Sequence, residues 1–354
     1  LCLLVLALTS IQRGYMTQAL NMALVGCGAI ARYHLDGLVE HAPNVRVTAC
    51  VDPDTEKAQA YAAETGGQAF ASLKEALDHG DFDAVDLMLP HDLHEELTIQ
   101  CLQAGKHVLL EKPMAPTLDA CDRILRVASQ TDTVFMVAEN AQYWPEIVQA
   151  KLLIDAGAIG EIITARAAFV YEYDDYWFKE ARPWRFERNR TGGGITIDGG
   201  SHWIRPLRMW MGEIKEVVGA IGHPLQQMEG ESLTRALIRF QSGQCAQFDA
   251  MMIDTVFAPE PWWRITGTKG EITISASLSG AELWLWDADH RDGKKVFSSP
   301  GYTASFGPEI ADFSAAVLNG KMLAAGPEYA LGELRTALAI YRSAKSGKWE
   351  SVWD

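Results

Sequence analysis

Basic residues are scarce in this chain of 354 residues: it has 31 lysines and arginines against 46 aspartates and glutamates, and its formal net charge is −15. Such an excess of negative charge repels nucleic-acid phosphates and anionic lipids wherever basic side chains do not gather. The densest basic stretch, from Arg182 to Arg190, is interrupted by Glu187 and by aromatic residues. The composition therefore predicts no nucleic-acid partner and no membrane partner.

Cysteine is also scarce, and its six positions show no Cys-x-x-Cys pair and no metal-type spacing to histidine. Reduced thiols in a cytoplasmic protein are the simplest expectation. The apolar run of residues 1–8 is shorter than the ~20 residues that span a bilayer. Because Met16 and Met22 precede a strand-like segment, we expect residues 1–15 to be a leader or upstream translation. Export directed by that leader is the alternative.

No low-complexity linker or internal repeat divides the chain, yet its length exceeds the ~250–300 residues at which single cores split into domains. Up to about residue 138, short apolar runs alternate with amphipathic stretches, which is typical of a doubly wound parallel sheet. The expected strands are residues 22–25, 45–51, 84–89, 108–110 and 134–137, and the expected helices are residues 29–40, 55–64, 94–104 and 118–129.

The pattern changes beyond residue 140, where the segments are longer. Turn signals stand at Ser242-Gly243, Thr268-Lys269-Gly270 and Asp292-Gly293. With strands expected at residues 233–240, 244–253 and 272–276, these turns favour a mostly antiparallel sheet. Helices near residues 308–318 and 328–346 close the chain. The expected fold is therefore α/β with two domains.

Two glycines stand where the first expected helix begins, in the segment Gly26-Cys27-Gly28-Ala29-Ile30, which follows an expected strand. This is the dinucleotide-binding fingerprint with Ala31 in the third glycine position. Gly26 permits a tight turn, and Gly28 lets the backbone approach a pyrophosphate at the helix N-terminus. The alternative is a tight turn without a ligand.

Asp52 ends the second expected strand, 21 residues beyond Ala31. An acid in this place bonds a ribose 2′-hydroxyl and repels a 2′-phosphate. The expected cofactor is therefore NAD. NADP is also compatible with the sequence, because Lys57 can reach a phosphate.

A second glycine-rich segment, residues 192–202, carries Asp198 and His202. Residues four apart share one face of a helix, so this spacing lets both side chains act on one substrate group. A histidine beside a carboxylate is suited to take a proton near neutral pH. The pair is a candidate catalytic site, and an ordinary surface ion pair is the alternative.

Several further motifs occur in order along the chain: Leu89-Pro90 with His94, Glu111-Lys112-Pro113, and segments 265–270 and 339–344. Together with both glycine-rich segments, they make the chain resemble the glucose–fructose oxidoreductase, inositol dehydrogenase and MocA (Gfo/Idh/MocA) family of NAD(P)-dependent enzymes. The resemblance extends from about Met22 to the C-terminus. The ordered series is far more specific than any one of its motifs.

The resemblance implies an N-terminal Rossmann domain at residues 16–139. It also implies a C-terminal α/β domain at residues 140–354, with a large open, mostly antiparallel sheet that binds substrate and forms homodimers or homotetramers. Glu111 would contact the nicotinamide ribose, and a cis Pro113 peptide would hold Lys112 near the substrate. Leu89, Pro90 and His94 would lie along the cofactor. Asp198 and His202 correspond to the catalytic acid and histidine of the family.

The substrate pocket is less well defined by the sequence, because Arg205, Pro206 and segment 138–145 depart from the family pattern. All eleven tryptophans lie at or beyond Trp144. They are either sheet core or a dimer face, or some of them (Trp144, Trp177, Trp184) line a pocket for a sugar ring. Asn140 and Arg185 either bind substrate hydroxyls or a carboxylate, or make structural hydrogen bonds.

The predicted activity is hydride transfer between a nicotinamide cofactor and a secondary alcohol or carbonyl of a sugar, cyclitol or related polyol. His202 would take the hydroxyl proton, Lys112 would bond the same oxygen, and Asp198 would orient the imidazole. An anhydro-sugar or dicarbonyl reductase, a dihydrodiol dehydrogenase and a non-catalytic NAD-binding sensor are the alternatives. No metal site is expected, because His91 and His94 lack a third ligand at a recognisable spacing.

Overall fold

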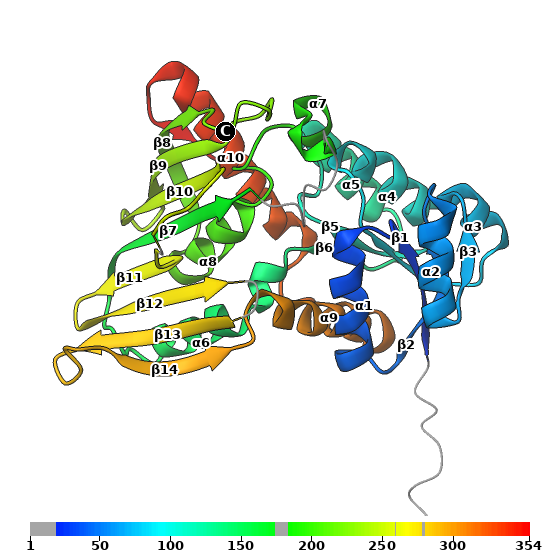
Figure 1. Cartoon of the computed structure of the whole chain (residues 1–354), viewed down its shortest axis with the longest axis horizontal. Helices are drawn as coiled ribbons and strands as arrows, with labels where there is room; N and C mark the ends of the chain where they lie inside the picture. The colour runs from blue at the N-terminus through cyan, green and yellow to red at the C-terminus, as the bar shows by residue number, and fades with distance from the viewer. Residues whose placement is uncertain (1–18, 174–182, 259, 278–279) are drawn as a thin grey trace, which may run out of the picture.

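The computed structural model describes residues 19–173, 183–258, 260–277 and 280–354. Within these residues the chain folds around two sheets that lie side by side, with helices packed on both (Figure 1). This arrangement confirms the predicted α/β class. The predicted Rossmann sheet and the predicted mostly antiparallel sheet are both present.

The first sheet holds parallel strands in the order β3-β2-β1-β4-β5-β6, so the strand order reverses at β1 and β4. In doubly wound sheets ligands bind beyond the carboxyl ends of the strands at that reversal. The sequence pattern misses β3 and α3, since three and seven residues are too few to show a period. The elements are β1 (Leu20–Val25), α1 (Ala29–His41), β2 (Val45–Val51), α2 (Thr55–Thr65), β3 (Gln68–Phe70), α3 (Leu73–His79), β4 (Ala84–Leu87), α4 (His94–Gln103), β5 (His107–Glu111), α5 (Leu118–Ala128) and β6 (Phe135–Ala138).

The second sheet has the order β14-β13-β12-β11-β7-β10-β9-β8-β15 in the part of the chain that the structure describes. Its central strands β7 and β10 are parallel, and the other neighbouring strands are antiparallel. The expected turns are present, with Gly243 and Gly293 at positive φ. The strands are β7 (Ile162–Glu172), β8 (Ile214–Gly222), β9 (Leu233–Phe240), β10 (Cys245–Ile253), β11 (Trp263–Gly267), β12 (Gly270–Ser277), β13 (Gly280–Asp287), β14 (Lys294–Ser299) and β15 (Glu350–Ser351).

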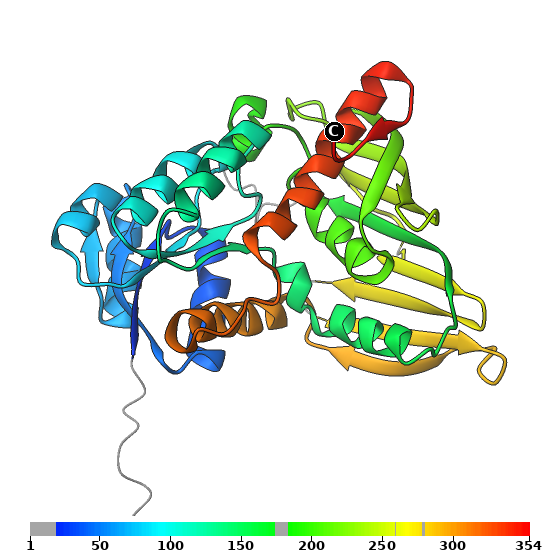
Figure 2. The same ribbon diagram turned by 180° about the vertical axis from the view of Figure 1, so that it is seen from behind.

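Helices cover the second sheet on the side seen in Figure 2. Helix α6 (Pro145–Asp155) lies along β13 and β14, α8 (Ser201–Met211) along β7 and β10, and α10 (Leu331–Ser346) along β8. The short helix α7 (Arg188–Thr191) contacts residues 91–93, which precede α4 in the unit built on the parallel sheet (the first unit). The apolar layer between helices and sheet is rich in tryptophan, including Trp144, Trp203, Trp210 and Trp263.

Helix α9 (Phe306–Asn319) returns from the second sheet to pack on α1. The two helices approach closely at Gly37, where an added Cβ would lie 2.7 Å from the backbone nitrogen of Gly307. Ile310 and Phe313 of α9 share a buried apolar cluster with β1. A helix from the later part of the chain thus completes the core of the first unit. The division of the chain between residues 139 and 140 stays a prediction.

The segment before α8 differs from the sequence expectation. Residues 195–200 form turns and α8 begins at Ser201, so Asp198 and His202 do not share a helical face. The prediction of that shared face was wrong. The glycines here serve close packing: an added Cβ would lie 2.0 Å from the carbonyl oxygen of Glu231 at Gly194, and 2.7 Å from the ring of Phe169 at Gly199. A turn forms because these contacts leave no room for side chains.

Candidate active site

A cavity of about 720 Å³ opens where the carboxyl ends of the parallel strands face the second sheet. Its first wall comes from the start of α1, from residues 88–91 after β4, and from the end of β5. Its second wall comes from the end of β7, from the turns before α8, and from α8 itself. This is the place where a doubly wound sheet binds its ligand.

One end of the cavity is built by the turn between β1 and α1. Gly26 has φ +94°, and an added Cβ there would lie 2.2 Å from the carbonyl oxygen of Met88. At Gly28 an added Cβ would meet no described atom within 4 Å. Every residue of α1 is described, and its N-terminus has neither a side-chain cap nor an acidic residue in its first turn. Its first N–H groups are therefore free to bind an anion, as a pyrophosphate requires.

Of the residues predicted to bind the cofactor here, Gly28, Ala29 and Ile30 line the cavity, while Gly26 and Cys27 precede them in the turn. Asp52 stands beside the same turn, directly after β2. Its Oδ2 accepts a hydrogen bond from the backbone N–H of Cys27 at 2.8 Å, and its Oδ1 accepts one from Asp54 at 2.8 Å. The carboxylate is therefore fixed next to the turn between β1 and α1. These residues fit a dinucleotide.

Lys112 follows β5 and lines the cavity beside Glu111. The peptide bond between Lys112 and Pro113 is cis, which confirms the expectation from the resemblance. The Lys112 ammonium donates to the Oδ1 of Asp198 at 2.7 Å and to the carbonyl oxygen of Asp198 at 3.0 Å. The ammonium is thereby held at the junction of the two units.

Asp198 is shared between two cations. Its Oδ2 lies 3.2 Å from the Nε of Arg185, whose guanidinium stacks 4.4 Å from the ring of Trp184. Burial alone would raise the pKa of Asp198, but Lys112 and Arg185 hold that pKa well below its usual range. Asp198 is therefore an anion that positions Lys112 and Arg185.

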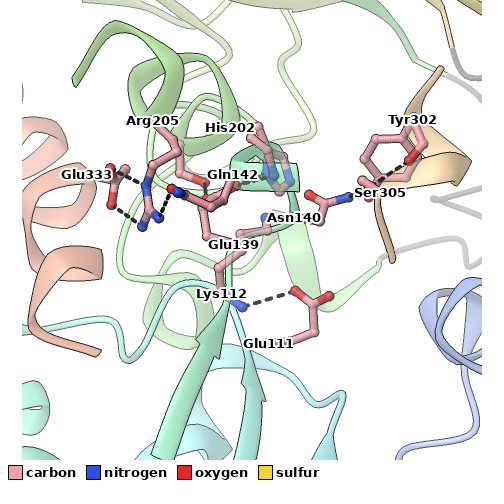
Figure 3. Close-up of polar contacts among 12 residues, drawn as sticks. Glu111, Lys112, Glu139, Asn140, Gln142, His202, Arg205, Tyr302, Ser305 and Glu333 are labelled. Atoms are coloured by element: carbon pink, nitrogen blue, oxygen red, sulfur yellow. Dashed lines mark hydrogen bonds and ion pairs between the residues drawn. The ribbon is translucent and has the colours of Figure 1, made fainter. Parts of the chain in front are cut away.

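The carboxylate on the His202 ring is Glu139, as Figure 3 shows. The Oε1 of Glu139 lies 2.5 Å from the Nδ1 of His202, and its Oε2 accepts the hydroxyl of Ser201 at 3.2 Å. Burial raises the pKa of Glu139, but His202, together with Arg205 and Lys112, outweighs this and lowers the pKa to about 2. The prediction that Asp198 orients the imidazole was wrong, since the turn at residues 195–200 directs Asp198 toward Lys112 instead.

Sequence reasoning missed Glu139, although a positional signal was available. Glu139 comes directly after β6, as Asp52 comes directly after β2 and Glu111 ends β5. Acids in these positions gather at the edge of the sheet where ligands bind. In a neutral His202 ring whose Nδ1 donates to Glu139, Nε2 is left as an acceptor. His202 lines the cavity.

Several predicted contacts lie outside the cavity wall. Trp144 is fully buried among other tryptophans, with its ring 6.0 Å from that of His202. Asn140 is also buried, and its amide donates to the hydroxyl of Ser305 at 2.9 Å (Figure 3). The prediction that Trp144 and Asn140 contact substrate was wrong, because both side chains pack into the core behind the cavity.

His94 is likewise removed from the cavity, whereas Leu89 and Pro90 line it. The fully buried His94 ring lies 2.9 Å from the carbonyl oxygen of Leu89 and 2.8 Å from that of Pro113. It tethers the two wall segments and was wrongly expected along the cofactor. Trp184 and Arg185 line the cavity, and Trp177 lies outside the described residues.

Two family models match this chain. One is the oxidoreductase family with an NAD-binding Rossmann fold, over residues 20–139, and the other is the GFO/IDH/MocA C-terminal domain, over residues 147–273. The chain belongs to the Gfo/Idh/MocA family. It is therefore an NAD-binding oxidoreductase, and the predicted cofactor and enzyme class are confirmed.

Relatives of this Gfo/Idh/MocA protein match nearly all of its length. It is 29% identical to a 1,5-anhydro-D-fructose reductase from Ensifer adhaerens, over 92% of this chain and 96% of that protein. It is 25% identical to a levoglucosan dehydrogenase from Pseudarthrobacter phenanthrenivorans, over 95% and 98%. The crystal structure of an oxidoreductase from Thermotoga maritima matches with a TM-score of 0.82 and 27% identity, over 94% and 98%.

Two further observations concern membrane-spanning helices and the cysteines. No helix in the described part of this family member is long and apolar enough to cross a membrane. Among the residues that the structure describes, Cys27, Cys50, Cys101, Cys121 and Cys245 are free thiols.

Proposed function

We propose that this enzyme transfers hydride between NAD and a secondary hydroxyl or carbonyl of a sugar, cyclitol or related polyol. The observation that carries the proposal is a single cavity that joins the open N-terminus of α1 to Lys112 and His202. The relatives are named for reactions on anhydro-sugars and inositol. Trp184, Trp262 and Phe169 give the cavity aromatic faces of the kind that sugar rings stack on.

The cofactor would be held by the chain at both ends of the cavity. The N–H groups at the start of α1 would bind the pyrophosphate, Asp52 the adenine-side ribose, and Glu111 the nicotinamide-side ribose. Leu89 and Pro90 would lie against it. When bound, NAD supplies the hydride acceptor, so the protein must supply orientation and proton management.

Proton management falls to His202. Its Nε2 would take the hydroxyl proton of an alcohol substrate, while Glu139 stabilises the resulting imidazolium through Nδ1. In the reverse direction the same ring would return the proton to a carbonyl oxygen.

Lys112 would donate a hydrogen bond to the reacting oxygen and stabilise its alkoxide-like state. Asp198 acts as a positioning residue here, because it fixes the ammonium through a side-chain and a backbone oxygen. Arg185, held by the same carboxylate and stacked on Trp184, would bind a further hydroxyl or a carboxylate of the substrate.

A reductase of an anhydro-sugar is the second candidate, supported by the named activity of a relative that matches almost the whole chain. The residues serve both directions equally, since microscopic reversibility uses the same acid and base. A non-catalytic NAD sensor would have no use for the ordered Lys112 and His202 contacts. We also propose a cytoplasmic homodimer or homotetramer, supported by the free thiols and by exposed Ile221 and Leu237 on adjacent strands of the open sheet.

The test is NADH formation or consumption on a panel of aldoses, inositols, anhydro-sugars and sugar acids, with NAD and NADP compared. Wild type, Lys112→Ala and His202→Asn are assayed in parallel, with NAD affinity measured separately by calorimetry. Turnover of one substrate class by wild type, with loss of turnover but retention of NAD binding in His202→Asn, supports the proposal. Tight NAD binding without turnover in either direction would favour the sensor.

A further inference from the structure

A buried histidine lies behind the cavity, on the dinucleotide-binding helix. His34 of α1 is fully buried, and its two ring nitrogens face two different acids. Nδ1 lies 2.8 Å from the Oδ2 of Asp86 on β4, and Nε2 lies 3.0 Å from the Oε1 of Glu111 at the end of β5. The ring thus connects α1 to two adjacent strands.

The two contacts determine the charge of the ring. A neutral imidazole has one N–H and donates once, so one carboxylate would face a lone pair across 3 Å or less. Burial by itself lowers the pKa of His34, but Asp86 and Glu111 outweigh it and raise that pKa well above 6.5. His34 lowers the pKa of Glu111 in turn, against the opposing effect of burial. The arrangement is an imidazolium between two carboxylates.

A third acid lies close by without disturbing this assignment. Glu309 of α9 is fully buried, and neither of its carboxyl oxygens has a hydrogen-bond partner among the described residues. Burial raises the pKa of Glu309 well above the usual range. His34 opposes this rise, while nearby Glu111, Glu139 and Asp86 add to it. This direction favours the protonated, neutral form of Glu309. The charged groups around His34 are then Asp86 and Glu111, with Glu139 farther along the same edge.

Glu111 is the part of this cluster that reaches the cavity. Its Oε2 accepts the backbone N–H of Lys112 at 3.0 Å, as Figure 3 shows, while its Oε1 is held by His34. Both oxygens are therefore fixed, and the carboxylate has one preferred orientation. Phe306 of α9 packs on the ring of His34 at 5.1 Å and closes the cluster from the other side.

We propose that His34 is a positioning residue for cofactor binding: as an imidazolium anchored by Asp86, it holds the Glu111 carboxylate charged and aimed at the nicotinamide-side ribose. The inference rests on the proposed function, in which Glu111 contacts that ribose. The same ring that fixes Glu111 sits on the helix whose N-terminus binds the pyrophosphate. One residue thereby sets the relative position of both ends of the cofactor site.

Two substitutions of His34 each keep one of its two contacts and remove the other. His34→Asn places an amide near the Nδ1 position and keeps the contact with Asp86, whereas His34→Gln places it near the Nε2 position and keeps the contact with Glu111. We expect the Kd for NAD, measured by calorimetry without substrate, to rise about 10- to 100-fold in His34→Asn. In His34→Gln we expect a rise of less than about 5-fold. A purely structural role would move stability in both and Kd in neither.

Further variants make the comparison specific. Glu309→Gln is the matched control, because an amide replaces a carboxyl that is already neutral, and its Kd should equal that of wild type. In a Glu111→Gln background, His34→Asn should add little to the loss, since the two residues act as one unit. Equal Kd values for wild type, His34→Asn and His34→Gln would overturn the proposal.

The ring itself is observed in the wild-type protein, which covers the case in which His34→Asn does not fold. Nitrogen NMR of histidine-labelled protein, with the His34 signal assigned by its loss in His34→Gln, should show both ring nitrogens protonated from about pH 5 to pH 8. A neutral ring at pH 7 would overturn the proposal. This readout needs no cofactor, so it tests the charge of the His34 ring even if NAD turnover is not found.

Discussion

At the scale of single residues, the decisive feature of the site is which of two acids, Asp198 or Glu139, contacts the His202 ring. Sequence spacing assigns the His202 ring to Asp198, but the structure assigns it to Glu139 and gives Asp198 to Lys112 and Arg185. The candidate catalytic residues could be found from motifs. Their pairing could not, because it depends on how a glycine-rich turn packs on a distant strand.

Glu139→Gln should lower kcat by ~10²–10⁴-fold, because the ring loses the carboxylate that stabilises its cation. The affinity for NAD should change little. Asn140→Ala is the matched control: Asn140 is the next residue, equally buried and outside the cavity, so its loss should affect stability but not kcat. Steady-state kinetics and NAD calorimetry on both variants make the comparison. Full activity of Glu139→Gln would assign the imidazole to another partner.

Asp52→Ser should shift the cofactor preference from NAD toward NADP, since it removes the charge that repels a 2′-phosphate. NAD binding itself should weaken, because the bond to the Cys27 N–H is also lost. The ratio of kcat/KM for the two cofactors measures the shift. Lys57→Ala is the companion variant and should weaken only NADP. An unchanged ratio in Asp52→Ser would show that Asp52 does not face the ribose.

At the scale of helices and strands, alternation of apolar runs was enough to predict most of the first sheet, and turn residues predicted three hairpins of the second. The return of α9 to α1 could not be predicted. It depends on two glycines far apart in sequence, Gly37 and Gly307, meeting at one crossing. Local periodicity reports which face of each helix is apolar but not which partner covers it.

Gly37→Ala should destabilise the protein by about 1–3 kcal/mol, the usual cost of overpacking, although alanine favours an isolated helix. The added Cβ would lie 2.7 Å from the Gly307 nitrogen and 2.9 Å from the Phe306 carbonyl carbon. Val39→Ala on the same helix is the control, since Val39 is 71% exposed, and it should change stability by less than about 0.5 kcal/mol. Urea unfolding of both variants measures the two changes in stability. A Gly37→Ala variant more stable than wild type would contradict the close helix contact.

At the scale of the whole molecule, the two units share cores and a cavity, and buried acids gather where they meet. Length and composition predicted two domains and the absence of a nucleic-acid surface. They could not show that Glu111, Glu139 and Glu309 would converge from three segments, because convergence is a property of the tertiary fold. Of these three, Glu139 and Glu111 are held as anions and Glu309 is held neutral.

These opposite pKa shifts predict opposite effects of pH on stability. The pKa of Glu309 is raised in the folded protein, so folding favours the protonated side chain. Burying Glu309 therefore costs no additional free energy of folding near pH 4, and this cost grows as pH rises. Glu309→Gln should therefore match wild type near pH 4 and exceed it in free energy of unfolding near pH 8. Urea titrations at both pH values give the difference, and a variant less stable than wild type at pH 8 would contradict it.

The depressed pKa of Glu139 works in the other direction. The contribution of Glu139 to the free energy of unfolding is present above about pH 4.5, and it is lost as pH falls toward the folded pKa of about 2. Wild type should therefore lose stability between those values. Glu139→Gln should lose less over the same range, because it has no carboxylate to protonate. Equal losses in the two proteins would show that Glu139 is not held as an anion.

The most direct test of the central claim follows a deuterium atom from substrate to cofactor. With a sugar or cyclitol that the enzyme oxidises, labelled by deuterium at the reacting carbon, the NADH formed should carry one deuterium by mass spectrometry. The same reaction of unlabelled substrate in D₂O should give NADH with none, because His202 handles only the hydroxyl proton. Label entering NADH from D₂O, or no NADH from any member of the panel, would contradict hydride transfer from a secondary alcohol in this cavity.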